Sequence, residues 1–209
     1  MYTHTKNILT AGTPVEQATA AMIMIHGRGG SAEDILSLAT HLDAKDMALF
    51  APQATQHSWY PYGFMSPVSA NQPALDSALA TIDELVESIV AGGIDREHIY
   101  FLGFSQGACL TLEYTTRHAS RYGGIIAFTG GLIGEQLDSS NYKGDFAQTP
   151  VLITTGDADP HVPVSRVQES STIIEKLGAV VTTKIYKDRP HTVSQQEIAL
   201  ANSLILSGK

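Results

Sequence analysis

A serine at position 105 stands in a sequence pattern that can turn a hydroxyl group into a nucleophile. The residues Gly103-Phe104-Ser105-Gln106-Gly107 spell G-x-S-x-G, with an apolar run before them and a helical pattern after them. Such a strained strand-to-helix turn tolerates only small neighbours, and the helix N-terminus behind the serine favours developing negative charge. We therefore predict that Ser105 is the nucleophile of an acyl-transfer reaction, rather than a serine that merely caps a helix.

A serine nucleophile needs a base and an acid that holds the base, which in this architecture follow in the order Ser, Asp or Glu, His. Two candidate acids stand in Gly156-Asp157-Ala158-Asp159-Pro160-His161-Val162-Pro163. Asp159 precedes a proline that favours extended backbone, whereas Asp157 could hydrogen-bond the turn. We favour Asp159, and both stay candidates at this point. His191, just before the last predicted helix, is the candidate base.

The same aspartates and His161 admit a metal-binding interpretation. No H-E-x-x-H or comparable ligand spacing accompanies Asp157, Asp159 and His161 in the sequence. We therefore expect no metal, and place His161 at the rim of a substrate pocket.

A glycine-rich loop after the first central strand predicts a site for a negatively charged oxygen. It reads His26-Gly27-Arg28-Gly29-Gly30-Ser31 and leads into a helix, so its backbone N–H groups can hold an anion. It lacks the G-K-[ST] ending of a phosphate loop and the G-x-G-x-x-G spacing of a dinucleotide site. We predict an oxyanion hole made by the backbone amides of Arg28 and Gln106.

An apolar and aromatic segment, residues 58–65, contains the only tryptophan of the chain. Aromatic and methionine side chains suit an acyl groove, so Trp59, Tyr60, Phe64 and Met65 are candidate substrate-binding residues. Packing of a long loop onto the core is an equally good interpretation, and the two are compatible. The single cysteine, Cys109, lies in an apolar setting on the predicted helix after Ser105, where we expect packing rather than chemistry.

The elements that must position these residues alternate along the chain. Short apolar runs predict strands, most of them buried on both faces, over residues 21–25, 47–51, 99–102, 124–128, 151–155 and 180–186. Helical patterns follow at 32–42, along the stripe Leu75, Leu79, Ile82, Val86 and Ile89, and at 106–118, 164–177 and 193–206. Alternation of this kind predicts one α/β domain over residues 1–209, with a mostly parallel sheet, helices on both faces and ligands at the carboxyl ends of the strands.

Composition excludes several classes of partner. The chain has 209 residues and a formal net charge of −8, which opposes nucleic acid and anionic lipid surfaces. No apolar run reaches the length of about 18 residues that a membrane helix requires, and the start resembles no signal peptide. One cysteine cannot form an internal disulfide, which fits a cytoplasmic location. Pairing into a homodimer stays open.

Taken together, four motifs resemble the phospholipase/carboxylesterase branch of the α/β-hydrolases, which is similar to the acyl-protein thioesterases. They are Ile25-His26-Gly27-Arg28-Gly29, Gly103-Phe104-Ser105-Gln106-Gly107-Ala108, the Asp159-Pro160 segment, and His191 before a final helix. The resemblance implies an α/β-hydrolase fold and a cofactor-free serine hydrolase acting on carboxylic esters, thioesters or lysophospholipids. It also implies Asp159 as the acid and the Arg28 and Gln106 amides as oxyanion donors. No long insertion separates the strands, so we expect no large lid.

The sequence departs from this family at two positions. Pro190 stands before the histidine where glycine is frequent, and Arg28 replaces an apolar residue. The Arg28 guanidinium could bind an anionic substrate group, but we favour a surface salt bridge to Glu33 or Asp34. Two rival functions stay open: a ligand-binding protein with little turnover on a hydrolase fold, and an acyltransferase in which an alcohol replaces water.

Overall fold

A seven-stranded sheet organises this computed structural model, which describes residues 2–207. The sheet runs in the order β1-β3-β2-β4-β5-β6-β7, and every neighbouring pair is parallel except β1 with β3. Its strands are β1 (Ile8–Gly12), β2 (Ala20–Ile25), β3 (Met47–Pro52), β4 (Ile99–Phe104), β5 (Gly124–Phe128), β6 (Pro150–Gly156) and β7 (Val180–Tyr186). The six strands expected from the sequence are all present, and the mostly parallel sheet is confirmed.

The two edge strands differ from the central ones in their burial. β1 pairs antiparallel with β3 and was not expected, because only Ile8 and Leu9 are partly buried and the rest of the strand is exposed. β7 forms the opposite edge and is also largely exposed, whereas every residue of β2 and β5 is buried. Burial on both faces therefore describes the middle of the sheet and fails at its edges.

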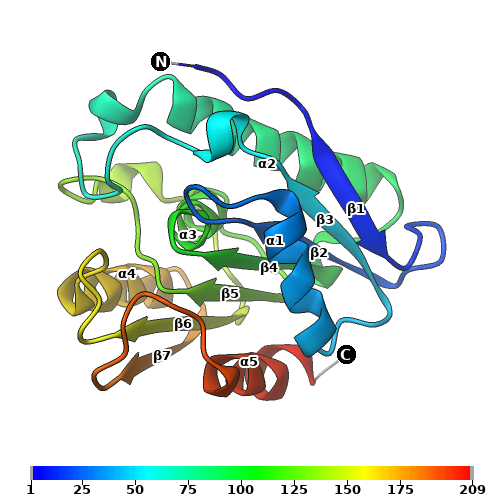
Figure 1. The fold of residues 1–209 in the computed structure, drawn as a ribbon. Helices are drawn as coiled ribbons and strands as arrows, with labels where there is room; N and C mark the ends of the chain where they lie inside the picture. The colour runs from blue at the N-terminus through cyan, green and yellow to red at the C-terminus, as the bar shows by residue number, and fades with distance from the viewer. Residues whose placement is uncertain (1, 208–209) are drawn as a thin grey trace.

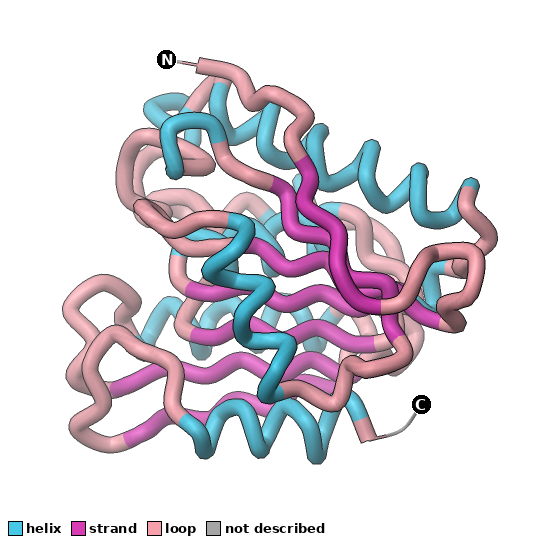
Figure 2. Tube along the Cα trace, turned by 45° about the vertical axis from the view of Figure 1, so that its right-hand side comes forward, coloured by secondary structure: helices cyan, strands magenta, loops and turns pink. Residues whose placement is uncertain are grey.

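Helices cover both faces of the sheet, as expected (Figures 1 and 2). On one face lie α2 (Ala74–Ala91), α3 (Gln106–Arg117) and α4 (Val164–Lys176), packed on strand residues such as Ile23 and Phe101. On the other lie α1 (Ala32–Ser37) and α5 (Gln195–Ala201), over Met22 and Leu102. Successive side chains of a strand point to opposite faces, so each central strand contributes to both cores.

Several helices end differently from their predicted bounds. The helix predicted over 32–42 stops at Ser37 and continues as a 3₁₀ turn, and the last helix begins at Gln195 and ends in a π-helical turn. The stripe from Leu75 to Ile89 is buried along α2, as its spacing predicted. The short helices are η1 (Leu38–His41), η2 (Thr55–His57), η3 (Val68–Asn71), η4 (Arg96–His98), η5 (Ser139–Asn141) and η6 (Asn202–Leu206).

The carboxyl ends of the parallel strands meet along one edge of the sheet, at the left in Figure 1. The chain leaves β2, β4, β6 and β7 there, so the loops that carry the candidate site residues come together at that edge. In the described chain, the loops that join the strands to the α-helices contain only short helices such as η2, η3 and η5, and no lid of the lipase kind. No helix within residues 2–207 has the length and apolar character needed to cross a membrane.

Candidate active site

Ser105 occupies a strained turn between β4 and α3. Its backbone lies at φ 54° and ψ −118°, a conformation that side chains rarely adopt, and its N–H donates to the Phe128 carbonyl over 3.0 Å. A Cβ added to Gly103 would lie 2.3 Å from the Gly107 carbonyl oxygen, and one on Gly107 would lie 2.1 Å from that of Ile25. Both glycines are therefore needed for the close approach of β4, α3 and β2 that holds this turn.

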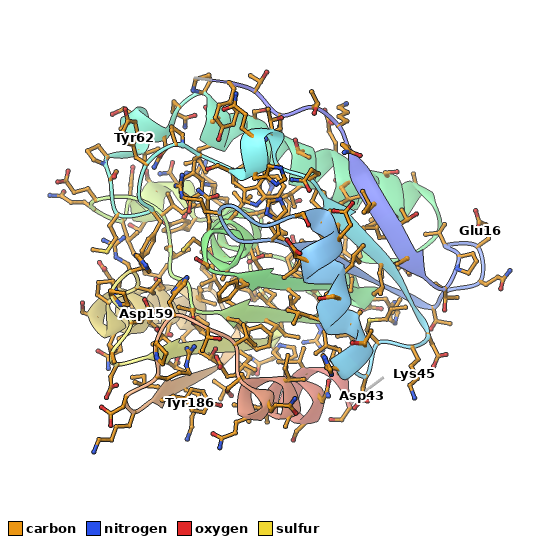
Figure 3. All side chains as sticks on the ribbon, viewed as in Figure 1. Glu16, Asp43, Lys45, Tyr62, Asp159 and Tyr186 are labelled. Atoms are coloured by element: carbon orange, nitrogen blue, oxygen red, sulfur yellow. The ribbon has the colours of Figure 1, made fainter. Side chains whose placement is uncertain are left out.

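Three side chains from separate loops form one chain of hydrogen bonds. The Ser105 hydroxyl lies 2.7 Å from His191 Nε2, and His191 Nδ1 lies 2.7 Å from Asp159 Oδ2. Ser105 follows β4, Asp159 follows β6 and His191 follows β7, so the strand ends supply all three. Figure 3 labels Asp159 at this edge of the sheet. The structure thus brings the predicted nucleophile, acid and base together.

The surroundings of Asp159 keep its carboxylate charged. Burial by itself would raise its pKa, but hydrogen bonds from the His161 and Val162 N–H groups and from His191 outweigh it and hold the pKa below its ordinary value. An ionised Asp159 accepts a hydrogen bond from a protonated Nδ1 of His191, which leaves Nε2 free to accept the hydroxyl proton of Ser105.

Asp157 has a different partner. Its Oδ1 accepts a hydrogen bond from the Asp188 N–H over 2.6 Å, which joins the loop after β6 to the loop after β7. The carboxylate of Asp157 therefore bonds to a neighbouring loop, and not to its own turn as the sequence suggested.

Two backbone amides beside Ser105 are free to bind an oxyanion. Within residues 2–207, neither the Arg28 N–H nor the Gln106 N–H donates to another protein atom. Gly27 packs against the nucleophile, since a Cβ on it would lie 3.3 Å from Ser105 Cβ. Gly29, at φ +78°, donates to the His57 carbonyl over 2.7 Å and so fixes the turn after Arg28. Both predicted oxyanion residues therefore border the serine.

The guanidinium of Arg28 corrects one expectation. It donates to four acceptors of residues 58–62, including the carbonyl oxygens of Tyr60 at 2.9 Å and Tyr62 at 2.6 Å. The salt bridge expected with Glu33 or Asp34 is wrong. Asp34 instead accepts the Ser31 N–H in the capping box that begins α1.

A cavity of about 340 Å³ opens beside the nucleophile. Tyr60, Phe64 and His161, all predicted to contact substrate, lie on its wall together with Val162 and Cys109. The ring of His161 packs edge-on against His191 with centroids 5.0 Å apart. The wall thus combines apolar side chains with the imidazoles of the site.

Trp59 and Met65, also predicted in the substrate groove, are not on this wall. Trp59 is fully buried, its indole N–H donates to the His26 carbonyl over 2.9 Å, and its ring packs on that of His26. Met65 is 39% exposed. The loop directs Trp59 inward and Met65 to the surface, so the expected groove does not include them.

Comparison with known proteins identifies one family. The model of the phospholipase/carboxylesterase family matches residues 7–206. The chain belongs to the phospholipase/carboxylesterase family. The mostly parallel sheet described above fits the α/β-hydrolase fold of this family.

Individual members of the phospholipase/carboxylesterase family support the assignment. A crystal structure of a phospholipase/carboxylesterase from Dyadobacter fermentans DSM 18053 is 64% identical, with a TM-score of 0.98 and 99% of each chain covered. Acyl-protein thioesterase 1 of Kluyveromyces lactis is 27% identical over 92% of this chain and 93% of its own length. A probable carboxylesterase SOBER1-like of Arabidopsis thaliana is 27% identical over 72% of this chain, and the match spans only 58% of that relative.

Two residues that the sequence did not single out hold the loop between β7 and α5, residues 187–194, which carries His191. We call it the histidine loop. Arg189 and Glu197 form a buried ion pair at 3.4 Å, Arg189 also donates to the Thr129 hydroxyl over 2.9 Å, and its guanidinium bonds the Thr192 carbonyl. Glu197 closes a capping box with Ser194 at the start of α5. The S-x-x-E spacing of that box is a sequence signal that could have located Glu197.

The thiol of Cys109 is not activated, although Cys109 lies on the cavity wall. Burial raises the pKa of this thiol to about 12, so it stays protonated, in keeping with packing. A metal has no ready-made site either: within the described residues, no three side chains of the His, Cys, Asp and Glu types gather as a metal site would require.

Proposed function

We propose that this chain hydrolyses carboxylic esters, thioesters or lysophospholipids through an acyl-serine intermediate, with Ser105, His191 and Asp159 as its catalytic residues. The observation that carries the proposal is the unbroken chain of two 2.7 Å hydrogen bonds from the Ser105 hydroxyl through His191 to Asp159. Family membership and the two free amides beside the serine support it.

In the first half of the reaction, Ser105 Oγ attacks the carbonyl carbon while His191 Nε2 takes the hydroxyl proton. Asp159 holds the imidazole in the required tautomer and stabilises the imidazolium. The carbonyl oxygen becomes an oxyanion that accepts hydrogen bonds from the Arg28 and Gln106 N–H groups. His191 then gives the proton to the leaving alcohol or thiol as the bond from the carbonyl carbon breaks.

In the second half, water attacks the acyl-serine. His191 accepts a proton from the water, the second oxyanion occupies the same two amides, and the proton returns to Ser105 Oγ as the carboxylic acid leaves. Tyr60, Phe64 and His161 line the cavity that would hold the acyl or alcohol part. A cytoplasmic location and a homodimer stay predictions from the sequence.

A fluorophosphonate probe with intact-mass detection tests the nucleophile directly. We expect one adduct on the wild type and none on Ser105→Ala, because the probe phosphonylates only an activated serine. Hydrolysis of a p-nitrophenyl ester should fall by about 10⁴-fold or more in kcat in this variant. Folded wild type without an adduct would reject the proposal and favour the ligand-binding alternative, and activity surviving in Ser105→Ala would reject Ser105.

A further inference from the structure

The two residues that supply the proposed oxyanion amides also send their side chains to one loop. We call residues 58–62 the rim loop; Figure 3 labels its last residue, Tyr62. Arg28 Nη1 donates to Ser58 Oγ at 2.9 Å and to the Pro61 carbonyl at 3.0 Å. Its Nη2 donates to the carbonyls of Tyr60 and Tyr62. One guanidinium therefore binds four acceptors of a five-residue segment.

The side chain of Gln106 also bonds to the rim loop. Its Oε1 accepts the Trp59 N–H at 2.9 Å, and its Nε2 donates to the Tyr60 carbonyl at 2.9 Å. Arg28 and Gln106 thus share one acceptor, the Tyr60 carbonyl oxygen, which also accepts the Ser58 hydroxyl at 2.9 Å. We call this set of bonds the Tyr60 clamp.

The rim loop is itself tied to the fold. The indole of Trp59 donates to the His26 carbonyl at 2.9 Å, and the side chain of buried Asn71 accepts the Tyr62 N–H at 2.9 Å. A loop held at both ends in this way is a fixed reference point. Each oxyanion amide belongs to a residue whose side chain is anchored there, so the clamp limits how far the two amides can move apart.

Arg28 has no carboxylate partner among the described residues, and its four bonds go to uncharged oxygens. Hydrogen bonds from a charged donor are stronger than neutral ones, and this charge is not cancelled by a nearby anion. With both terminal nitrogens occupied, the guanidinium is better suited to hold the loop than to hold a substrate carboxylate.

We propose that the side chains of Arg28 and Gln106 are positioning groups that, through the shared Tyr60 carbonyl, set the separation of the two oxyanion amides. The inference rests on the proposed function, which uses only the backbone N–H groups of Arg28 and Gln106. It adds a role for the side chains of these two residues. Small errors in the placement of an oxyanion donor are costly in the transition state and matter little for substrate binding. The clamp therefore acts on kcat.

A double-mutant cycle tests the clamp. Gln106→Met keeps the length of the side chain, Arg28→Met keeps an unbranched apolar stem, and both remove the side-chain hydrogen bonds. Each should lower kcat by about 10-fold to 100-fold, with KM within about 3-fold of the wild type. The double variant should lose less than the product of the single losses, because both act through one carbonyl. Losses that multiply, or a raised KM with unchanged kcat, would overturn the clamp.

Arg28→Lys separates geometry from charge. Lysine keeps the positive charge but cannot span the four acceptors, so kcat should stay as low as in Arg28→Met. Full rescue by lysine would reject the clamp. The variants are also assayed on a neutral ester and on one with a carboxylate in its acyl chain. Equal losses are expected, and a loss confined to the anionic ester would mean that Arg28 binds substrate.

Arg121→Met is the matched control, since it removes an exposed arginine that donates to the Ala147 carbonyl at 3.1 Å in another part of the chain. It should keep the wild-type kcat. The backbone amide resonance of Gln106, followed by ¹⁵N NMR, should shift in Arg28→Met and not in Arg121→Met. This readout needs no turnover. Wild type that hydrolysed no ester would reject the proposed function, whereas an unshifted Gln106 resonance would reject the clamp.

Discussion

Asp157 and Asp159 lie two residues apart, but their carboxylates accept hydrogen bonds from different parts of the chain. Asp159 meets His191 Nδ1 and the N–H groups of His161 and Val162, whereas Asp157 meets the Asp188 N–H at the start of the histidine loop. The first arrangement controls a tautomer and a charge. The second needs only an oxygen that accepts one hydrogen bond, which asparagine also provides.

This contrast predicts losses of activity of very different size for two conservative changes. Asp159→Asn should lower kcat by about 10⁴-fold, because an amide favours the wrong tautomer of His191. Asp157→Asn should stay within about tenfold of the wild type, because its Oδ1 can still accept the Asp188 N–H. Steady-state hydrolysis of a p-nitrophenyl ester measures both. Equal losses in the two variants would contradict the assignment of Asp159.

Positions next to strand ends could be predicted from the sequence, but the direction of a side chain in a long loop could not. Ser105 directly follows β4 and His191 lies in the loop after β7, so the parallel sheet brings both to the same edge. Trp59 and Arg28 depend on the fold of residues 58–62. The aromatic character of Trp59 suits the core and a groove equally, and Arg28 had apparent carboxylate neighbours in the sequence.

The loop that carries His191 is fastened to α5 by the buried pair of Arg189 and Glu197. The side chains are 8% and 0% exposed, and Glu197 also accepts a hydrogen bond from the hydroxyl of Thr154 in β6. Removing one partner of such a pair leaves the other charge buried, which costs more than losing a surface pair.

Glu197→Gln should therefore lower the free energy of unfolding by about 3 kcal/mol. Urea unfolding measures this change. It should also lower kcat more than it alters KM, since the change reaches the loop of His191 and not the cavity wall. Glu84→Gln is the matched control: its pair with Lys6 is exposed, so no more than about 1 kcal/mol is expected. Equal effects would show that the buried pair does not brace this loop.

Among the elements, the central strands and α2 could be predicted from the sequence. Short continuous apolar runs are typical of buried strands, and apolar residues at a 3.6-residue period are typical of an amphipathic helix. β1 could not, since only Ile8 and Leu9 are partly buried and an exposed edge strand leaves little apolar signal. The end of α1 at Ser37 was also missed. The turn that follows it, Leu38–His41, keeps helical spacing over four residues while its hydrogen bonds change to the 3₁₀ pattern.

The stability of the whole chain should depend on pH through His26, which is buried, and His4, which is partly buried. Burial lowers the pKa of His4 and His26 from 6.5. Below that pH the unfolded chain binds protons at these rings that the folded chain does not, so unfolding is favoured. Their contribution to stability is therefore complete above pH 6.5 and is lost as the pH falls through the pKa values of the folded state.

The free energy of unfolding should accordingly decrease as the pH is lowered from about 7 to about 5. Denaturant unfolding across that range measures the slope. His4→Gln should reduce the slope, because it removes one of the two rings whose pKa is lowered by burial. A wild-type stability that stayed constant over this range would contradict the assignment of neutral rings to His4 and His26.

Across the molecule, three arginines hold loops at the carboxyl edge of the sheet. Arg28 binds the rim loop, Arg166 binds the carbonyls of Leu132 and Gly134, and Arg189 binds the histidine loop. Each of these arginines donates at least one hydrogen bond to a backbone carbonyl oxygen. Three loops around the candidate site are thus tied to the rest of the fold through arginine side chains.

The chain contains a single cysteine, and Cys109 is 1% exposed with a strongly raised pKa. Thiol-directed dyes react with thiolates that solvent can reach, so we expect them not to label the native protein. A cysteine introduced at any exposed position becomes a unique attachment point without first removing Cys109. Placed on the rim loop at Tyr62, whose side chain is 58% exposed, such a dye would report on motion beside the nucleophile in an otherwise unaltered sequence.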